Sequence, residues 1–209
     1  NKENSEIIRS TKCSLNFSNT HKLDTISEFI NEYTKVCQQF IDILWVLKDK
    51  QKLLGLLSKD IISQIGETKL SARALQACGK QASSIVRGTI TKHNRRMFML
   101  KKLMKNGKST KKLQKAISKT ILSKPELTTI NPELDGRFTK IVQSNNSFDM
   151  WIKLSSTGFK PIYIPIRKHK HYNRLVEQNY ALKSGCRLGL NDISFNFSKL
   201  KTLKITGEK

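Results

Sequence analysis

The sequence lacks the features that mark membrane, secreted and zinc-binding proteins. It has no run of about 18 apolar residues, so we expect no membrane-spanning helix. No basic segment followed by an apolar one opens the chain, so we do not expect secretion. The four cysteines, Cys13, Cys37, Cys78 and Cys186, never approach the C-x-x-C spacing of a zinc site. Because the first residue is Asn rather than Met, we expect a piece of a longer protein.

Catalytic motifs are missing as well. No G-x-S-x-G, P-loop or G-x-G-x-x-G pattern occurs. Asp135, Asp149 and Asp192 are spread along the chain, whereas a two-metal nuclease needs acids that converge on one site. His169 and His171 form an H-x-H pair without a third ligand nearby, which favours RNA contact or a surface role over metal binding. We therefore predict no catalytic residue, metal ligand or cofactor in this chain, although acids distant in sequence can still meet in space.

Basic residues, by contrast, are abundant and unevenly placed. The chain has 39 Lys and Arg against 16 Asp and Glu, a net charge of +23. Residues 1–67 are balanced, whereas residues 68–125 contain no acid at all. Sixteen bases lie in that segment: Lys69, Arg73, Lys80, Arg87, Lys92, Arg95, Arg96, Lys101, Lys102, Lys105, Lys108, Lys111, Lys112, Lys115, Lys119 and Lys124. Like charges at helical spacing repel one another, so an unmixed segment favours contact with phosphates. A lysine-rich codon bias or an anionic membrane are the alternatives, but a codon bias would not also remove the acids.

The first two-thirds of the chain reads as one strand followed by helices. Residues 7–17 alternate in the manner of a strand, and Ser18, Asn19 and Thr20 offer caps for a helix that runs to about residue 48. A second helical piece is predicted at Lys52–Ile65. A third helix, capped by Thr68 or Ser71, runs to Asn106-Gly107, with Cys37 and Cys78 as small core residues of the apolar stripes. Residues 108–124 form a short helix or a mobile arm.

After Pro125 the pattern is that of strands. Residues 138–143, 148–154 and 159–166 predict a β-meander, a basic loop follows at 167–174, and further strands lie near 180–188 and 192–198. The order strand, helices, strands predicts an α+β protein: one β-barrel interrupted by a helical insertion, with the first strand joining the later sheet.

Several segments together resemble the N-terminal half of the TnpB-like family, the transposon-encoded RNA-guided endonucleases and the type V CRISPR effectors. The segments are IIRSTKCSLNF (7–17), LSARALQACGKQASSIVRG (70–88), FDMWIKL (148–154), KPIYIPIRKHKHYNR (160–174) and ISFNFSKLKTLKITGEK (193–209). The resemblance implies an OB-like wedge (WED) barrel interrupted by a helical recognition (REC) lobe. Its domains would be 1–18, the first WED strand; 19–125, the REC insertion; and 126–209, the rest of the barrel. The RuvC nuclease and the zinc ribbon of the family are not in this chain.

The resemblance also implies partners. These are a guide RNA and a target DNA, together with the missing nuclease part or a second copy of the chain, and no membrane. Mg²⁺ is expected only for a RuvC domain in the parent protein. The location implied is the cytoplasm, at the nucleoid, of a prokaryotic or mobile-element host.

The nucleic-acid contacts come from three segments. By resemblance, Gln76, Lys80, Gln81, Ser83 and Ser84 would read the DNA motif next to the target, and the stretch IPIRKHKHYNR (164–174) would grip the RNA scaffold. From the residues themselves, Lys- and Arg-rich helices suit a guide–target duplex, which a protein holds by its phosphates. The full set is Gln76, Lys80, Gln81, Ser83, Ser84, Arg87, Lys92, Arg95, Arg96, Lys101, Lys102, Lys105, Arg167, Lys168, His169, Lys170, His171, Tyr172, Asn173 and Arg174.

Among the aromatic residues, Tyr172 is the best candidate to stack on a base, with a barrel-edge role as the alternative. Trp45 and Trp151 lie on apolar stripes and are expected in the core. Two other functions stay open for the whole chain. One is a nuclease-dead, RNA-guided repressor that binds DNA without cutting it. The other is a stand-alone basic RNA-binding protein of ribosomal-protein type.

Overall fold

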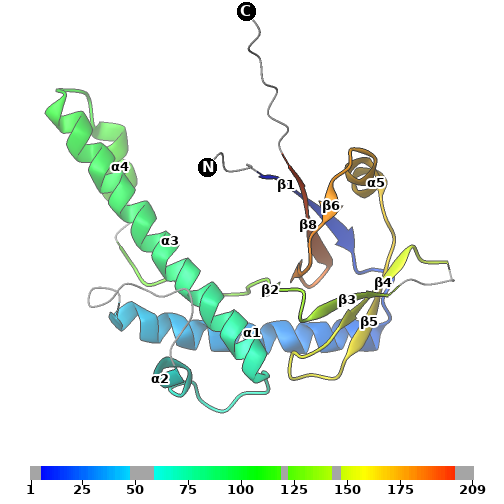
Figure 1. Cartoon of the computed structure of the whole chain (residues 1–209). Coiled ribbons are helices and arrows are strands. Elements are labelled where there is room, and N and C mark those ends of the chain that lie inside the picture. Colours follow the sequence, from blue (N-terminus) through cyan, green and yellow to red (C-terminus); the bar gives the residue numbers. More distant parts are fainter. Residues whose placement is uncertain (1–5, 48–58, 119–121, 143–146, 201–209) are drawn as a thin grey trace, which may run out of the picture. The chain divides into compact units, whose positions relative to one another are not determined.

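The computed structural model describes all residues except 1–5, 48–58, 119–121, 143–146 and 201–209 (Figure 1). The predicted α+β class is confirmed. The chain divides into two compact units. The first, here the sheet unit, contains residues 1–30 and 131–209, and the second, the helical unit, contains residues 31–130. Helix α1 (Thr20–Leu47) begins in the sheet unit and ends in the helical unit. None of the helices in the described ranges has the length and apolar character needed to cross a membrane.

The larger sheet joins the two ends of the chain. Strand β1 (Glu6–Ser14) pairs along its whole length with β8 (Asp192–Leu200), in antiparallel register from Glu6 opposite Leu200 to Ser14 opposite Asp192. The other edge of β8 is shared by β6 (Ala181–Leu182) and β7 (Cys186–Leu188), and β7 pairs with β2 (Glu133–Leu134). The prediction that the first strand joins the later sheet is therefore confirmed.

The smaller sheet is the predicted meander. It has the order β3 (Thr139–Val142), β4 (Met150–Leu154), β5 (Ile162–Ile166). Every second residue of β4 is buried, which gives the period-two pattern of a strand with one face in the core. Pro165 has no N–H to donate, so β5 suits a sheet edge. Within the described residues the strands form two open sheets, and the predicted closure into one barrel is not seen among them.

The predicted basic loop at 167–174 is wrong. The chain forms helix α5 (Lys170–Glu177) there, with His169 as its N-cap. Tyr172 and Leu175, three residues apart, form the buried face of this helix. Charged neighbours hide that short apolar pattern in the sequence, because a two-residue stripe gives almost no periodic signal.

The turn between β6 and β7 contains a glycine, Gly185. Gly185 has φ of +91°, a backbone conformation that side-chain-bearing residues rarely adopt. A Cβ at this position would lie 2.5 Å from the carbonyl oxygen of Leu134. The close approach of this turn to β2 therefore requires glycine.

We expect Gly185→Ala to lower the free energy of unfolding by about 2 kcal/mol or more, because it adds both backbone strain and a clash with the main chain. Gly88→Ala is the matched control. Gly88 lies within a helix, and a Cβ there meets nothing within 4 Å, so alanine should stabilise by about 0.5–1 kcal/mol. Urea unfolding of both variants measures the difference. Equal stabilities would contradict the close approach at Gly185.

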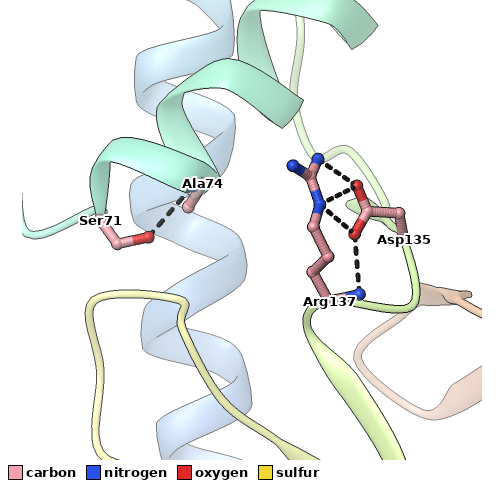
Figure 2. A network of polar contacts seen from close by, with 4 residues as sticks. All are labelled: Ser71, Ala74, Asp135 and Arg137. Carbon is pink, nitrogen blue, oxygen red and sulfur yellow. Dashed lines mark hydrogen bonds and ion pairs between the residues drawn. The ribbon is translucent and has the colours of Figure 1, made fainter.

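The helical unit is built on α1 and α3 (Ala72–Lys105), as predicted from the apolar periodicity. Ser71 caps α3, its Oγ accepting the N–H of Ala74 at 3.1 Å (Figure 2). Just before it, the Thr68 hydroxyl donates to Glu32 of α1 at 2.6 Å, which lowers the pKa of that carboxyl. The predicted helix at Lys52–Ile65 is seen only as α2 (Lys59–Ile62), and its part up to residue 58 lies outside the described residues.

Helices α3 and α4 (Lys111–Ser118) form a hairpin. The N–H of Gly107 bonds to the Met104 carbonyl at 3.1 Å, and the N–H of Lys108 bonds to the Leu103 carbonyl at 3.0 Å. With Gly107 at φ +62°, this is a Schellman C-cap. Of the two forms predicted for residues 108–124, the short helix is the one found.

Candidate nucleic-acid interface

The first half of α3 packs against α1. Apart from Gln81, its buried positions carry small or medium-sized side chains; the buried residues are Ala74, Cys78, Gly79, Gln81, Ala82, Ser83 and Val86. The Tyr33 hydroxyl of α1 donates to the Gln81 amide oxygen at 2.9 Å, and the Cys78 thiol donates to the Tyr33 carbonyl at 3.5 Å. These two buried hydrogen bonds fix the rotation of α3 about its own axis.

That packing corrects part of the predicted set of base readers. Gln81 and Ser83 are buried, so neither side chain reaches a base in this structure. Gln76, Lys80 and Ser84 are exposed, although the Ser84 hydroxyl donates to the Lys80 carbonyl at 3.0 Å. Burial removes two of the five predicted readers and leaves three on the surface.

The opposite face of α3 carries a row of exposed polar side chains. Arg73, Lys80, Arg87, Asn94 and Lys101 recur every seven residues, and all five are exposed. Seven residues are close to two turns, so the members of this row lie nearly in line and about 10 Å apart. Four of the five are cationic at neutral pH. The row follows almost the whole helix, which is about 51 Å long.

The second half of α3 has no buried residue beyond Val86. Together with α4 it forms the basic hairpin, residues 89–118. Ten bases and no acid lie in it: Lys92, Arg95, Arg96, Lys101, Lys102, Lys105, Lys108, Lys111, Lys112 and Lys115. All are exposed except Arg96, which is half-buried. Lys119 lies outside the described residues. Among the described residues, no carboxylate forms an ion pair with Lys92, Arg95 or Lys102.

Lys124 differs from the other bases of the acid-free segment. Its ammonium lies 2.8 Å from Asp42 of α1, and this hydrogen bond raises the pKa of Lys124. The segment that follows is held along α1: the Gln38 amide accepts the N–H of Leu127 and donates to the Pro125 carbonyl. Lys124 therefore helps to hold the segment after α4 against α1.

In the sheet unit, His169 has a structural task. Its Nδ1 accepts the N–H of His171 at 3.2 Å, so the ring proton is on Nε2. Nε2 donates to the carbonyl oxygen of Lys12 at 2.8 Å, and the Thr11 hydroxyl lies 3.0 Å away. Both ring nitrogens are engaged within the chain, so neither is left to bond to RNA. The His169 side chain is nevertheless exposed, and the RNA contact predicted for it stays a prediction. The ring of His171 stacks on it, with centroids 6.2 Å apart.

Tyr172 is also not the stacking residue that we predict from the sequence. It is buried, packs edge-on against Phe197 at 5.0 Å between centroids, and its hydroxyl donates to the sulfur of Met150. Burial raises the pKa of its phenol. The remaining members of the predicted set around α5, Arg167, Lys168, Lys170, His171, Asn173 and Arg174, are exposed.

Several acids of the sheet unit have a local partner. Asp135 receives Arg137 in a forked arrangement with distances of 2.6–3.1 Å, drawn in Figure 2, and this pairing raises the pKa of Arg137. Asp149 accepts the N–H of Lys168 at 2.6 Å, and Asp192 faces Lys12 at 3.5 Å. In the ranges that the structure describes, no group of three or more His, Cys, Asp or Glu could hold a metal ion.

The cysteines are buried rather than reactive. Burial raises the pKa of Cys13 to about 11 and that of Cys186 to about 12, and it also raises the pKa of Cys78. A thiol with such a pKa stays protonated at neutral pH and is a poor nucleophile or metal ligand. The predicted core role of Cys37 and Cys78 is confirmed.

The structure also shows a cluster of aromatic and basic side chains that the sequence did not predict. Phe17, Phe148 and Trp151 form a chain of ring contacts, with centroids 5.9 and 5.5 Å apart. The Arg167 guanidinium lies over the two phenylalanines, and the Lys22 ammonium lies over the indole. We call these five residues the aromatic–cation cluster. Trp151 is half-buried rather than in the core, as is Trp45. Pairs of an aromatic and a base at different places in the chain give no sequence signal.

No model of a known protein family matches the chain, and no curated protein sequence matches it.

We expect His169→Ala to lower the free energy of unfolding by about 1 kcal/mol, since it removes the cap of α5 and the link to β1. His169→Asn should recover most of this loss, because asparagine caps helices well. Nucleic-acid affinity should stay within twofold of the wild type in both variants. Urea unfolding and a binding titration measure the two quantities. Weaker binding by a stably folded His169→Asn variant would instead support the predicted RNA contact.

Proposed function

We propose that this chain binds nucleic acid as the guide-RNA- and target-DNA-holding part of a TnpB-like RNA-guided DNA endonuclease. The observation that carries the binding proposal is the basic hairpin, with ten bases and no acid, continued by the exposed row on α3. Surfaces of ordinary globular proteins mix the two signs, because unmixed charge repels itself. A polyanion would relieve that repulsion.

Phosphate contact is the chemistry that these side chains suit. A guide–target heteroduplex is A-form, and base pairing supplies its sequence recognition, so a protein needs only to hold its backbone. Lysine and arginine at the spacing of the α3 row can follow one strand of such a duplex. Gln76, Lys80 and Ser84, exposed on the first half of α3, are the side chains left to reach base edges in an adjacent DNA motif.

The wedge-barrel assignment belongs to the same proposal. The pairing of β1 with β8 across the helical insertion supports it, as does the meander β3–β5. In this assignment the sheet unit grips the RNA scaffold through the exposed bases near α5. No catalytic step is assigned to this chain.

The first experiment removes charge from the row and the hairpin. In the variant Lys80→Ala, Arg95→Ala, Lys102→Ala, Lys105→Ala we expect weaker binding and a log–log salt slope flatter by about 3–4 units, because each lost phosphate contact contributes about 0.9. The control variant removes the same charge from exposed bases elsewhere: Arg9→Ala, Lys35→Ala, Lys59→Ala, Lys140→Ala. It should change the slope by less than about one unit. Equal slopes in the two variants would refute the assigned surface.

The hairpin's own stability gives an independent test. Ten like charges should destabilise it at low ionic strength, and salt should relieve the repulsion as the screening length shortens. We expect the thermal midpoint to rise by several degrees between about 0.05 M and about 0.5 M sodium chloride. Replacing Lys102, Lys105, Lys111 and Lys112 by Gln should flatten this rise. A midpoint that falls with salt would show that attraction, not repulsion, dominates the surface.

Sequencing of RNA that co-purifies with the chain separates the candidate functions. A single structured species with a variable end supports a guide RNA, whereas ribosomal RNA supports the stand-alone RNA-binding alternative. Intact or substituted RuvC acids in the parent reading frame separate the endonuclease from the nuclease-dead repressor.

A further inference from the structure

The aromatic–cation cluster gathers five side chains from four segments of the sheet unit. Phe17 follows β1, Lys22 lies in the first turn of α1, Phe148 and Trp151 lie before and within β4, and Arg167 follows β5. The Arg167 guanidinium carbon is 5.0 Å from the centre of the Phe17 ring and 5.6 Å from that of Phe148. The Lys22 ammonium is 4.9 Å from the centre of the indole. The segments thus bring three rings and two cations into one connected set of contacts.

This cluster is not part of the hydrophobic core. The Phe17 side chain is 43% exposed, and Phe148 and Trp151 are half-buried. Three adjoining aromatic rings near water would ordinarily be covered by apolar side chains, yet here the covering groups are cations. A guanidinium held against two rings is already restricted in its motion. The side chain therefore loses little conformational entropy when a ligand stacks on it.

Rings and cations side by side match the chemistry of a nucleotide. A base stacks on an aromatic ring or on an arginine plane, and its phosphate meets a cation. The charge of the neighbourhood fits as well: residues 150–176 hold Lys153, Lys160, Arg167, Lys168, Lys170 and Arg174 and no acid. Asp149, the acid just before this stretch in the sequence, accepts the main-chain N–H of Lys168.

We propose that the aromatic–cation cluster is a stacking platform for an unpaired base of RNA, with Phe17 and Arg167 as its contact residues. The base must be unpaired because a base inside a duplex already has its faces covered. This inference deepens the proposed function and rests on it. It assigns to the sheet unit a site for single-stranded RNA, in addition to the phosphate contacts of the helical unit.

Fluorescence can follow the platform directly. Trp45→Phe leaves Trp151 as the sole tryptophan, and it lies in ring contact with Phe148. In this background we expect a short oligouridylate to quench the emission, and a blunt RNA duplex of equal length to quench it much less. Quenching by the two probes to the same extent at saturation would overturn the inference.

Two substitutions locate the contact. We expect Phe17→Ala and Arg167→Ala each to weaken oligouridylate binding about fivefold or more, the lower end of what loss of one base–aromatic stack costs, and to leave duplex binding within twofold. Tyr163→Ala is the matched control: Tyr163 is also 43% exposed and also lies under a cation, Lys153 at 5.6 Å. It should bind oligouridylate as the wild type does. Circular dichroism melting verifies that each variant folds.

The outcomes separate the two proposals. If the wild type binds the duplex but Phe17→Ala and Arg167→Ala leave oligouridylate binding unchanged, the platform is wrong and the proposed function stands. If the wild type binds neither probe near physiological salt, the proposed function fails too. Vesicles of phosphatidylcholine with phosphatidylserine test the other surface that aromatics and cations suit. Vesicle binding that depends on Phe17 and displaces the oligouridylate would overturn the RNA assignment.

Discussion

The buried contact between α1 and α3 decides which side of α3 is exposed. Tyr33 bonds to Gln81 on α3 and receives the thiol of Cys78 through its carbonyl, and small residues around these bonds allow close packing. A buried hydrogen bond that is broken leaves an unsatisfied polar group, so the helix cannot rotate at low cost. With that rotation fixed, Arg73, Lys80 and Arg87 lie on the outer face. The basic surface is thus a consequence of how the apolar face packs.

Charge is handled differently in the two units. In the sheet unit several acids lie next to bases, as Asp135 does with Arg137 and Glu6 with Lys183, so part of the local charge cancels. Exposed pairs of this kind contribute little to stability, but they lower the field around the strands. The basic hairpin has no such acids, and capping at both ends of α3 supplies the local stability that repulsion takes away. The positive charge of the hairpin is therefore suited to neutralisation by an anionic ligand.

The helices were predictable because their signals are local. The α1 and α3 stripes repeat over many turns, and Ser71 and Asn106-Gly107 cap α3 where the sequence indicates. Element order alone predicted that the first strand joins the later sheet, but not that its partner there is β8. Closure into a barrel depends on which sheet edges pair with each other. Local sequence patterns do not reveal that pairing, because it is set by contacts between residues far apart in the chain. The burial of Gln81 and Ser83 could not be predicted from the sequence either. A polar side chain is buried only where another element supplies its hydrogen-bond partner, as Tyr33 does for Gln81.

The same reasoning explains why the sequence favoured the wrong aromatic residue. Tyr172, among basic neighbours, has the local context of a stacking residue, but it belongs to the two-residue buried face of α5. The sequence places Phe17 at the end of an apolar strand. In the structure it lies beyond β1 and contacts Arg167, which follows β5 about 150 residues later in the chain. The two surfaces should also differ in their physics. Phosphate contacts weaken steeply with salt because counterions are released, whereas stacking on a ring depends on salt only weakly. An RNA with paired and unpaired parts would therefore shift its dependence from the basic hairpin to the aromatic–cation cluster as ionic strength rises.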